Sequence, residues 1–170
     1  NTKLLNEAKK TAKAADKVIV VIGLTFLEES EGFDRASYQI APGHQQLLDA
    51  VIASNDNVIV VLQNGSPVAM PWIEKVDGII EAYLGGQAGG LALADVITGK
   101  VNPSGKLAET FPVKIEDNPT HIAWAGEEGK TYYNEGPFVG YRYYDEKKIK
   151  PLFPFGYGLS YSQFEFSDIN

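Results

Sequence analysis

Carboxylates crowd one short segment of the chain, Glu28 to Arg35, which directly follows the apolar run Val18 to Gly23. They are Glu28, Glu29, Glu31 and Asp34. Like charges that are held close together and partly buried favour a carboxyl group that keeps its proton near neutrality, as a general acid must. In open α/β sheets ligands bind beyond the carboxyl ends of the strands, and a loop after an apolar run would lie there. The pattern therefore indicates acid–base chemistry and bond cleavage.

A purely structural role explains the same residues. Glu28 and Glu29 can be solvated side chains of an exposed loop, and Asp34 can pair with Arg35 or cap a turn. Spacing alone does not separate this interpretation from the catalytic one. Both stay open on the residue pattern.

Other reactive residue types lack the spacing that their chemistry needs. The cluster Gly85 to Gly90 does not match the dinucleotide-binding fingerprint, so close helix–sheet packing is the favoured reason for its glycines. His44 and His121 lie far apart and form no metal-binding pair. Ser66 and Ser104 stand in turn sequences without a nucleophile elbow. We therefore predict neither a cofactor nor a metal.

Apolar periodicity predicts alternating helices and strands in the first hundred residues. Helical spacing of apolar residues predicts an amphipathic helix over 4–15. Continuous apolar runs are typical of parallel strands covered on both faces, and they lie at 18–22, 58–62 and 78–83. Pro42 begins a predicted helix that ends near Ile52, and a helix opened by the glycine cluster stops at Gly99. We predict a doubly wound α/β fold, a three-layer sandwich with a mostly parallel sheet.

Composition excludes several classes of partner. The 22 acidic residues outnumber the 15 basic ones, and the net charge of −7 disfavours binding to a phosphate backbone. The chain has no cysteine, so disulfides and thiolate metal sites are absent. No apolar run approaches the roughly 18 residues of a membrane-spanning helix. We predict no nucleic-acid partner and no membrane partner, and the compartment is not readable from the sequence.

The last third of the chain has a different character. From Val101 onward turn residues dominate and periodicity fades, and most of the aromatic residues gather after Phe138. Aromatic side chains at this density fill a core or a domain seam more often than they stack on sugars. We predict an α/β domain over 1–137 and an aromatic-rich tail over 138–170 that packs on it.

Several motifs, met in order along the chain, resemble those of one enzyme family. They are Gly23-Leu24, Glu29-Ser30-Glu31-Gly32-Phe33-Asp34-Arg35, Asn102-Pro103-Ser104-Gly105-Lys106-Leu107 with Thr110-Phe111-Pro112, Glu135-Gly136 with Phe138-Val139-Gly140-Tyr141-Arg142-Tyr143-Tyr144, and Phe153-Pro154-Phe155-Gly156-Tyr157-Gly158-Leu159-Ser160-Tyr161. The set is similar to glycoside hydrolase family three, the β-glucosidase group. It covers nearly the whole chain, and independent motifs in family order are more specific than a single short pattern.

The resemblance is to the second domain of this family and implies an architecture. That domain is an α/β sandwich that packs against a (β/α)-barrel and is often followed by a fibronectin-type β-sandwich, into which the tail would lead. The family domain normally opens with a further strand and a glycine-rich loop, and this sequence lacks both. Some relatives carry an inserted sugar-binding domain near that place, so Asn1 is expected to mark where the domain resumes.

The resemblance also implies a reaction and its residues. It implies retaining hydrolysis of terminal β-linked glucosides, with an Asp nucleophile on the barrel and a Glu acid/base on a loop of the second domain. That Glu corresponds to Glu31, with Glu29 as the fallback, and Phe33 is expected to bind substrate. Asp34 and Arg35 are expected to brace the loop. The chain alone, without the barrel, is expected to be inactive.

A second hypothesis stays open beside the enzyme. The domain can be a non-catalytic module that binds carbohydrate or supports a barrel, with the aromatic tail as its contact surface. A Glu31 side chain in a concave mouth at the carboxyl edge of the sheet favours the enzyme. A Glu31 side chain in solvent, far from any crevice, favours the module.

Overall fold

The computed structural model describes residues 1–124 and 126–167. The chain forms two compact units, 1–89 and 90–170, and each is considered by itself. The predicted division at residues 137 and 138 stays a prediction. In the part of the chain that the structure describes, no helix has both the length and the apolar character needed to cross a membrane.

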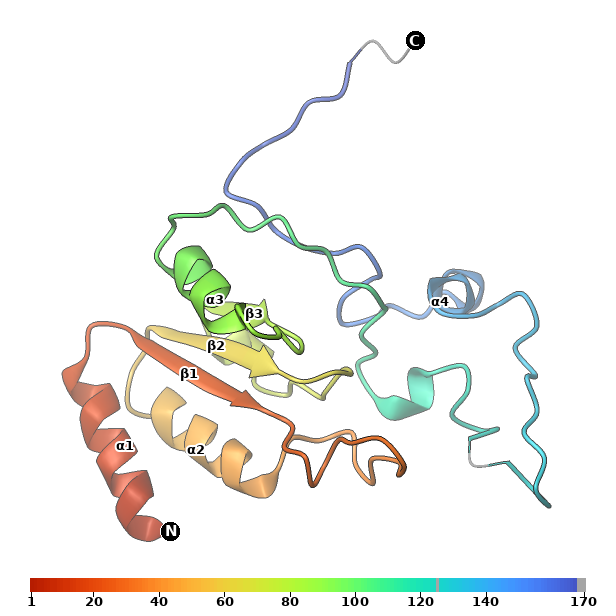
Figure 1. Cartoon of the computed structure of the whole chain (residues 1–170), viewed down its shortest axis with the longest axis horizontal. Helices are drawn as coiled ribbons and strands as arrows, with labels where there is room; N and C mark the ends of the chain where they lie inside the picture. Colours follow the sequence, from red (N-terminus) through yellow and green to blue (C-terminus); the bar gives the residue numbers. More distant parts are fainter. Residues whose placement is uncertain (125, 168–170) are drawn as a thin grey trace. The chain divides into compact units, whose positions relative to one another are not determined.

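The first unit is an α/β structure built on a three-stranded parallel sheet (Figure 1). Its elements are α1 (Thr2–Ala14), β1 (Val18–Gly23), α2 (Pro42–Ile52), β2 (Val58–Gln63), a 3₁₀ turn (Ile73–Lys75) and β3 (Gly78–Glu81). The strand order β1-β2-β3 follows the sequence. The predicted α/β class, parallel sheet and βαβ unit are therefore confirmed.

The register of the sheet aligns the carboxyl ends of the strands. Val18 lies opposite Val58 and Gly23 lies opposite Gln63, while Leu62 lies opposite Glu81. The third strand ends at Glu81, two residues earlier than predicted. One oxygen of the Glu81 carboxylate accepts the N–H of Tyr83 at 3.1 Å, and Tyr83 has φ of +48°, so the backbone leaves the strand there.

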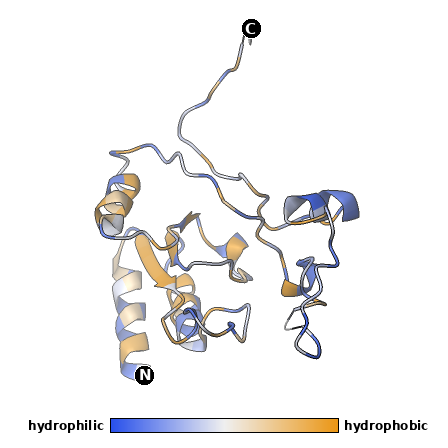
Figure 2. Cartoon of the chain, turned by 45° about the vertical axis from the view of Figure 1, so that its right-hand side comes forward, coloured by the Kyte–Doolittle hydropathy of each residue, from blue (hydrophilic) through white to orange (hydrophobic). Residues whose placement is uncertain are grey.

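The core of the first unit lies around the central strand. Helices α1 and α2 pack against each other, and α2 packs on β1. In Figure 2 the strands are coloured as hydrophobic, whereas α1 alternates between the two colours. Along β2, Val58, Val60, Val61 and Leu62 are fully buried, as predicted for a strand covered on both faces. Each such side chain contributes about 1.5 to 3 kcal/mol by leaving water.

Strand β1 differs from that prediction. It is an edge strand of the sheet, and its side chains alternate between exposed and buried positions from Ile19 to Ile22. Val20 and Ile22 are buried, whereas Ile19 is 43% exposed and Val21 is 52% exposed. Only one face of β1 is covered in this chain, because helix α2 packs there and nothing in the described chain covers the other face to the same degree.

The second unit is poor in regular structure, as the sequence predicted. Helix α3 (Gly89–Ile97) begins at the last residue of the first unit and ends before Gly99, which has φ of +72° and acts as the predicted C-cap glycine. A 3₁₀ turn (Ile115–Asp117) follows. Helix α4 (Tyr141–Lys147) lies in the aromatic tail and was not predicted, because its aromatic residues give no clear apolar stripe.

Aromatic contacts hold two distant segments of the second unit together. The N–H of Phe111 donates to the carbonyl of Phe153 at 2.8 Å, and the N–H of Leu107 donates to the carbonyl of Tyr157 at 2.8 Å. The Phe111 and Phe153 rings meet edge to face at 6.3 Å, and the Phe153 and Tyr157 rings lie 5.0 Å apart. Phe111 and Tyr144 are buried. Part of the tail therefore fills a small core.

We predict that Gly23→Ala destabilises the sheet. A Cβ atom at Gly23 would overlap the carbonyl oxygen of Gln63 on the neighbouring strand, so β1 and β2 would have to separate. We expect a loss of about 2 to 3 kcal/mol, typical of overpacking. The measurement is urea unfolding of the full-length protein. Gly43→Ala is the matched control, since its Cβ would meet nothing within 4 Å, and an unchanged midpoint for Gly23→Ala would contradict the close approach.

We also predict an alkaline loss of stability that depends on Tyr144. Burial first, then the charge of Asp117 and the neighbouring Tyr143, raise the pKa of Tyr144 from 10.0 to about 12. The folded state favours the neutral phenol, so this stabilisation is complete below pH 10 and disappears between pH 10 and 12. Urea unfolding across this range should depend less on pH in Tyr144→Phe. Tyr133→Phe, at an exposed position, should behave as the parent protein does.

Candidate active site

The carboxyl edge of the sheet is where the candidate residues emerge. The loop that contains the crowded carboxylates begins after Gly23, and the turn after β2 begins at Asn64. The register places Gly23 opposite Gln63, so the two segments leave the sheet side by side. The acidic loop and the turn after β2 are therefore neighbours because of the parallel pairing alone.

Glu28 closes the first turn of its own loop. The N–H groups of Glu28 and Glu29 donate to the carbonyl of Thr25 at 2.8 and 2.9 Å. The Glu28 carboxylate accepts the N–H of Thr25 at 2.8 Å in return. Glu28 therefore has a local role that does not reach beyond this turn.

Glu29 reaches the neighbouring strand end. Its carboxylate accepts the N–H of Gly65 at 2.7 Å and the hydroxyl of Ser66 at 2.5 Å. Glycine is suited to position 65, since a Cβ atom there would lie 3.2 Å from a Glu29 carboxylate oxygen. The contact joins residues 36 apart in the sequence, and no spacing rule could have found it.

Arg35 binds the same turn from the far end of the acidic segment. Its guanidinium donates to the Ser66 hydroxyl at 3.2 Å and to the carbonyl of Pro67 at 2.6 Å. It also lies over the Tyr38 ring, 5.9 Å from the ring centre. The predicted bracing role of Arg35 is confirmed by these contacts, whereas that of Asp34, an exposed residue, stays a prediction.

Glu31 lies between these two attachment points. Glu31, Gly32 and Phe33 are exposed, and Phe33 keeps 52% of its surface accessible. Gly32 has φ of +96°, a conformation that glycine adopts without strain, and it turns the chain directly after Glu31. No donor among the described residues binds the Glu31 carboxylate. The expectation that Glu31 is partly shielded is not met within this chain, because no element of its own unit covers the loop.

The turn after β2 is itself held firmly to the sheet. Asn64 is fully buried, and its side-chain amide donates to the Ser66 carbonyl at 2.9 Å and to the Glu81 carboxylate at 3.3 Å. Asn64 to Pro67 form the predicted turn, but its role as the anchor of the acidic loop was not predicted. The Asn-Gly-Ser-Pro run was the available signal.

Glu31 lines neither of two hollows found among the described residues. One of about 220 Å³ lies at the ends of β1 and β2, where a His44 ring nitrogen is 2.9 Å from the carbonyl of Gly23. His44 therefore serves as a hydrogen-bonding residue at the end of β1. The other, of about 400 Å³, lies beside α4 and is lined by Pro137, Phe138, Arg142, Asp145 and Glu146.

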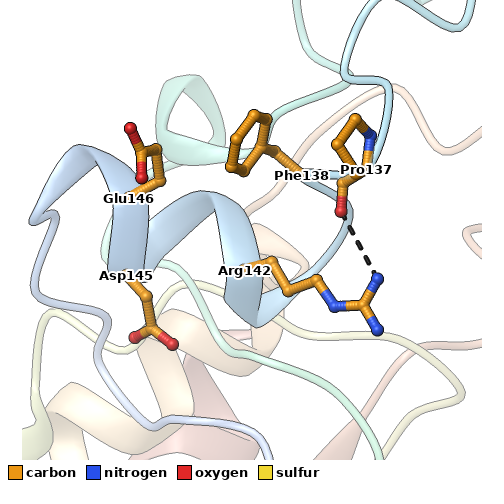
Figure 3. A pocket seen from close by; sticks show the side chains of 5 residues that line it. All are labelled: Pro137, Phe138, Arg142, Asp145 and Glu146. Carbon is orange, nitrogen blue, oxygen red and sulfur yellow. Dashed lines mark hydrogen bonds between the residues drawn. The ribbon is translucent and has the colours of Figure 1, made fainter.

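The hollow beside α4 is a shallow surface feature. Figure 3 shows Arg142 extending from the helix toward Pro137, whose carbonyl accepts a long hydrogen bond of 3.5 Å from the guanidinium. Asp145 and Glu146 project from the same helix. Within residues 1–124 and 126–167, no group of three or more histidine or carboxylate side chains is placed to hold a metal.

Comparisons with known proteins identify the domain. The glycosyl hydrolase family 3 C-terminal domain matches residues 2–161. The thermostable β-glucosidase B of Acetivibrio thermocellus is 59% identical over 167 residues, which are 98% of this chain and 22% of that protein. The chain thus spans about a fifth of this curated relative.

Solved structures agree with this match. The family 3 β-glucosidase of Bifidobacterium adolescentis superposes with a TM-score of 0.92 at 54% identity, over 96% of this chain and 24% of that one. The β-glucosidase of Kluyveromyces marxianus in complex with glucose also has a TM-score of 0.92, at 41% identity, over 96% of this chain and 20% of that one. The chain belongs to glycosyl hydrolase family 3 and is its C-terminal domain.

Proposed function

We propose that this chain supplies Glu31 as the acid/base of a retaining β-glucosidase. The substrate class is terminal β-linked glucosyl residues, and the nucleophilic Asp lies on a separate barrel domain. Membership in the family and the similarity to β-glucosidases support this function. The single observation that favours Glu31 over its neighbours is that its carboxylate has no hydrogen-bond partner among the described residues, whereas Glu28 and Glu29 use theirs in hydrogen bonds.

The chemistry requires two carboxyl groups about 5 to 5.5 Å apart. One attacks the anomeric carbon and forms a glycosyl–enzyme intermediate. Glu31 donates its proton to the departing glycosidic oxygen, and afterwards accepts a proton from the water that releases the sugar. This chain provides only the second group, so it is inactive alone.

The exposure of Glu31 fits a shared site. An acid/base has to protrude from its own domain in order to reach a nucleophile that another domain carries. The barrel then supplies the remaining wall and excludes water from the carboxyl group. Without this wall Glu31 is exposed, as it is in this chain.

Phe33 supplies an aromatic face close to the acid/base. It lies two residues after Glu31 and is half exposed. Aromatic rings pack well against the apolar C–H face of a sugar ring. We propose that Phe33 contacts the substrate or its leaving group.

We further propose that the complete domain is a doubly wound three-layer sandwich with an additional strand beside β1. The support is the exposed apolar face of this edge strand, formed by Ile19 and Val21. Parallel strands are normally buried on both faces. A further strand and its connections would cover these side chains.

A non-catalytic module is the second candidate. By the criterion given above, the exposed Glu31 side chain, which lines neither hollow described, favours this candidate. So do aromatic residues that remain exposed in the second unit, notably Trp124, Tyr133, Phe155 and Tyr161. These residues would form a contact surface for a sugar or for another domain. This candidate predicts that no carboxylate of the acidic loop affects turnover.

We predict that Glu31→Ala in the full-length enzyme abolishes most turnover of poor leaving groups. Loss of the general acid should reduce kcat/KM for alkyl β-glucosides by about 10² to 10⁴-fold. Substrates with good leaving groups need little protonation and should lose far less. Azide should restore turnover of the activated substrates, because it attacks the glycosyl intermediate without a general base. Steady-state kinetics and detection of glucosyl azide provide the measurement.

The two substrate classes serve as each other's control. An equal loss on both would indicate a folding defect rather than a missing acid. Unchanged turnover of poor leaving groups in Glu31→Ala would remove Glu31 from the role and favour the non-catalytic module.

A further inference from the structure

We propose that Glu29 is a positioning residue that fixes the Glu31 loop onto the turn after β2. The inference rests on the proposed function, since it concerns how Glu31 is placed. It assigns different roles to two glutamates that are separated by one residue. Glu29 holds the loop, and Glu31 acts on the substrate.

The Glu29 contact is strong because a charged acceptor meets two well-placed donors. One carboxylate oxygen binds the Gly65 N–H at 2.7 Å, and the other binds the Ser66 hydroxyl at 2.5 Å. Hydrogen bonds to an ionised carboxylate are roughly twice as strong as neutral ones. Glu29 is also partly buried, so water competes less for its oxygens.

Ser66 joins the two ends of the acidic segment. Its hydroxyl donates to Glu29 and lies 3.2 Å from an Arg35 guanidinium nitrogen, for which it is the acceptor. A serine hydroxyl can serve as donor and acceptor at once. Both ends of the segment from Glu29 to Arg35 are therefore bound to the same turn. Glu31 lies in this short loop, two residues from the Glu29 attachment.

The turn to which the loop is bound is itself fixed to the sheet. Buried Asn64 ties it to Glu81 at the end of β3, and β2 is the most deeply buried strand. The position of Glu31 is thus fixed relative to the buried sheet through the turn after β2. Active sites depend on such placement, since an error of about 1 Å can reduce a rate about 10²-fold.

The same contacts make Glu29 unsuitable as the proton donor. Each of its oxygens already accepts a hydrogen bond from the turn, so a Glu29 side chain that moved to a substrate to deliver a proton would have to give up these contacts. The Glu31 carboxylate forms no such hydrogen bond with the described residues. The hydrogen bonds therefore separate two residues that the sequence pattern left equivalent.

The test compares Glu29→Ala, Glu29→Gln and Glu28→Ala in the full-length enzyme. We expect Glu29→Ala to lower kcat about 10 to 100-fold, with a smaller change in KM. The pH profile should keep both limbs, and azide should not restore activity, since Glu31 is still present. Glu29→Gln should retain about tenfold more activity than Glu29→Ala, because an amide oxygen still accepts the Gly65 N–H. Glu28→Ala, whose contact is confined to its own turn, should match the parent enzyme.

Hydrogen exchange measures the attachment without reference to activity. Amides of residues 24–41 should exchange faster in Glu29→Ala and at the parent rate in Glu28→Ala. Ser66→Ala keeps the Gly65 donor to Glu29 but removes both the Ser66–Glu29 and the Arg35–Ser66 hydrogen bonds, so exchange should rise at both ends of the loop. Because both changes act on one contact, the double variant Glu29→Ala with Ser66→Ala should lose less than the sum of the single losses.

Several results would overturn the proposal. Rescue of Glu29→Ala by azide, or loss of one limb of its pH profile, would make Glu29 the acid/base itself. Equal losses in Glu29→Ala and Glu29→Gln, or parent-like exchange in Glu29→Ala, would exclude positioning through hydrogen bonds. These outcomes differ from failure of the proposed function, in which Glu31→Ala remains active while exchange in Glu29→Ala is still accelerated.

Discussion

The hydrogen bonds from the Gly65 N–H and the Ser66 hydroxyl to the Glu29 carboxylate are the constraint on which the candidate site depends. Parallel pairing brings the ends of β1 and β2 together, but it does not determine where a loop goes after it leaves the sheet. The Glu29 contact determines that path, and Arg35 reinforces it from the other side. Between these anchors Gly32, with its positive φ, turns the chain directly after the exposed Glu31.

The four clustered carboxylates show what a sequence pattern does and does not contain. Their crowding and their place after an apolar run were visible, and they predicted where the candidate site would lie. Their separate roles were not visible, because the partner of Glu29 lies 36 residues away and that of Glu28 is the backbone of its own turn. Distant donors, rather than spacing, distinguish one glutamate from the next.

The fold was predictable where continuous apolar runs and helix signals were strong. The strands β1 and β2 and the bounds of α2 follow from β-branched runs and from Pro42. The early end of β3 was not predictable, since the Glu81 side chain accepts a backbone N–H and turns the chain. Helix α4 was missed because its tyrosines gave no clear apolar stripe, and the pairing of Phe111 with Phe153 joins segments far apart in sequence.

The most direct test of the central claim is a crystal structure of the full-length enzyme with its glycosyl intermediate trapped by a 2-deoxy-2-fluoroglucoside. The Glu31 carboxylate should lie about 5 to 5.5 Å from the sugar-bearing carboxylate of the barrel. Glu29 should keep its hydrogen bonds to Gly65 and Ser66. A structure in which Glu29 faces the sugar and Glu31 points away from it would show that the two roles are assigned wrongly.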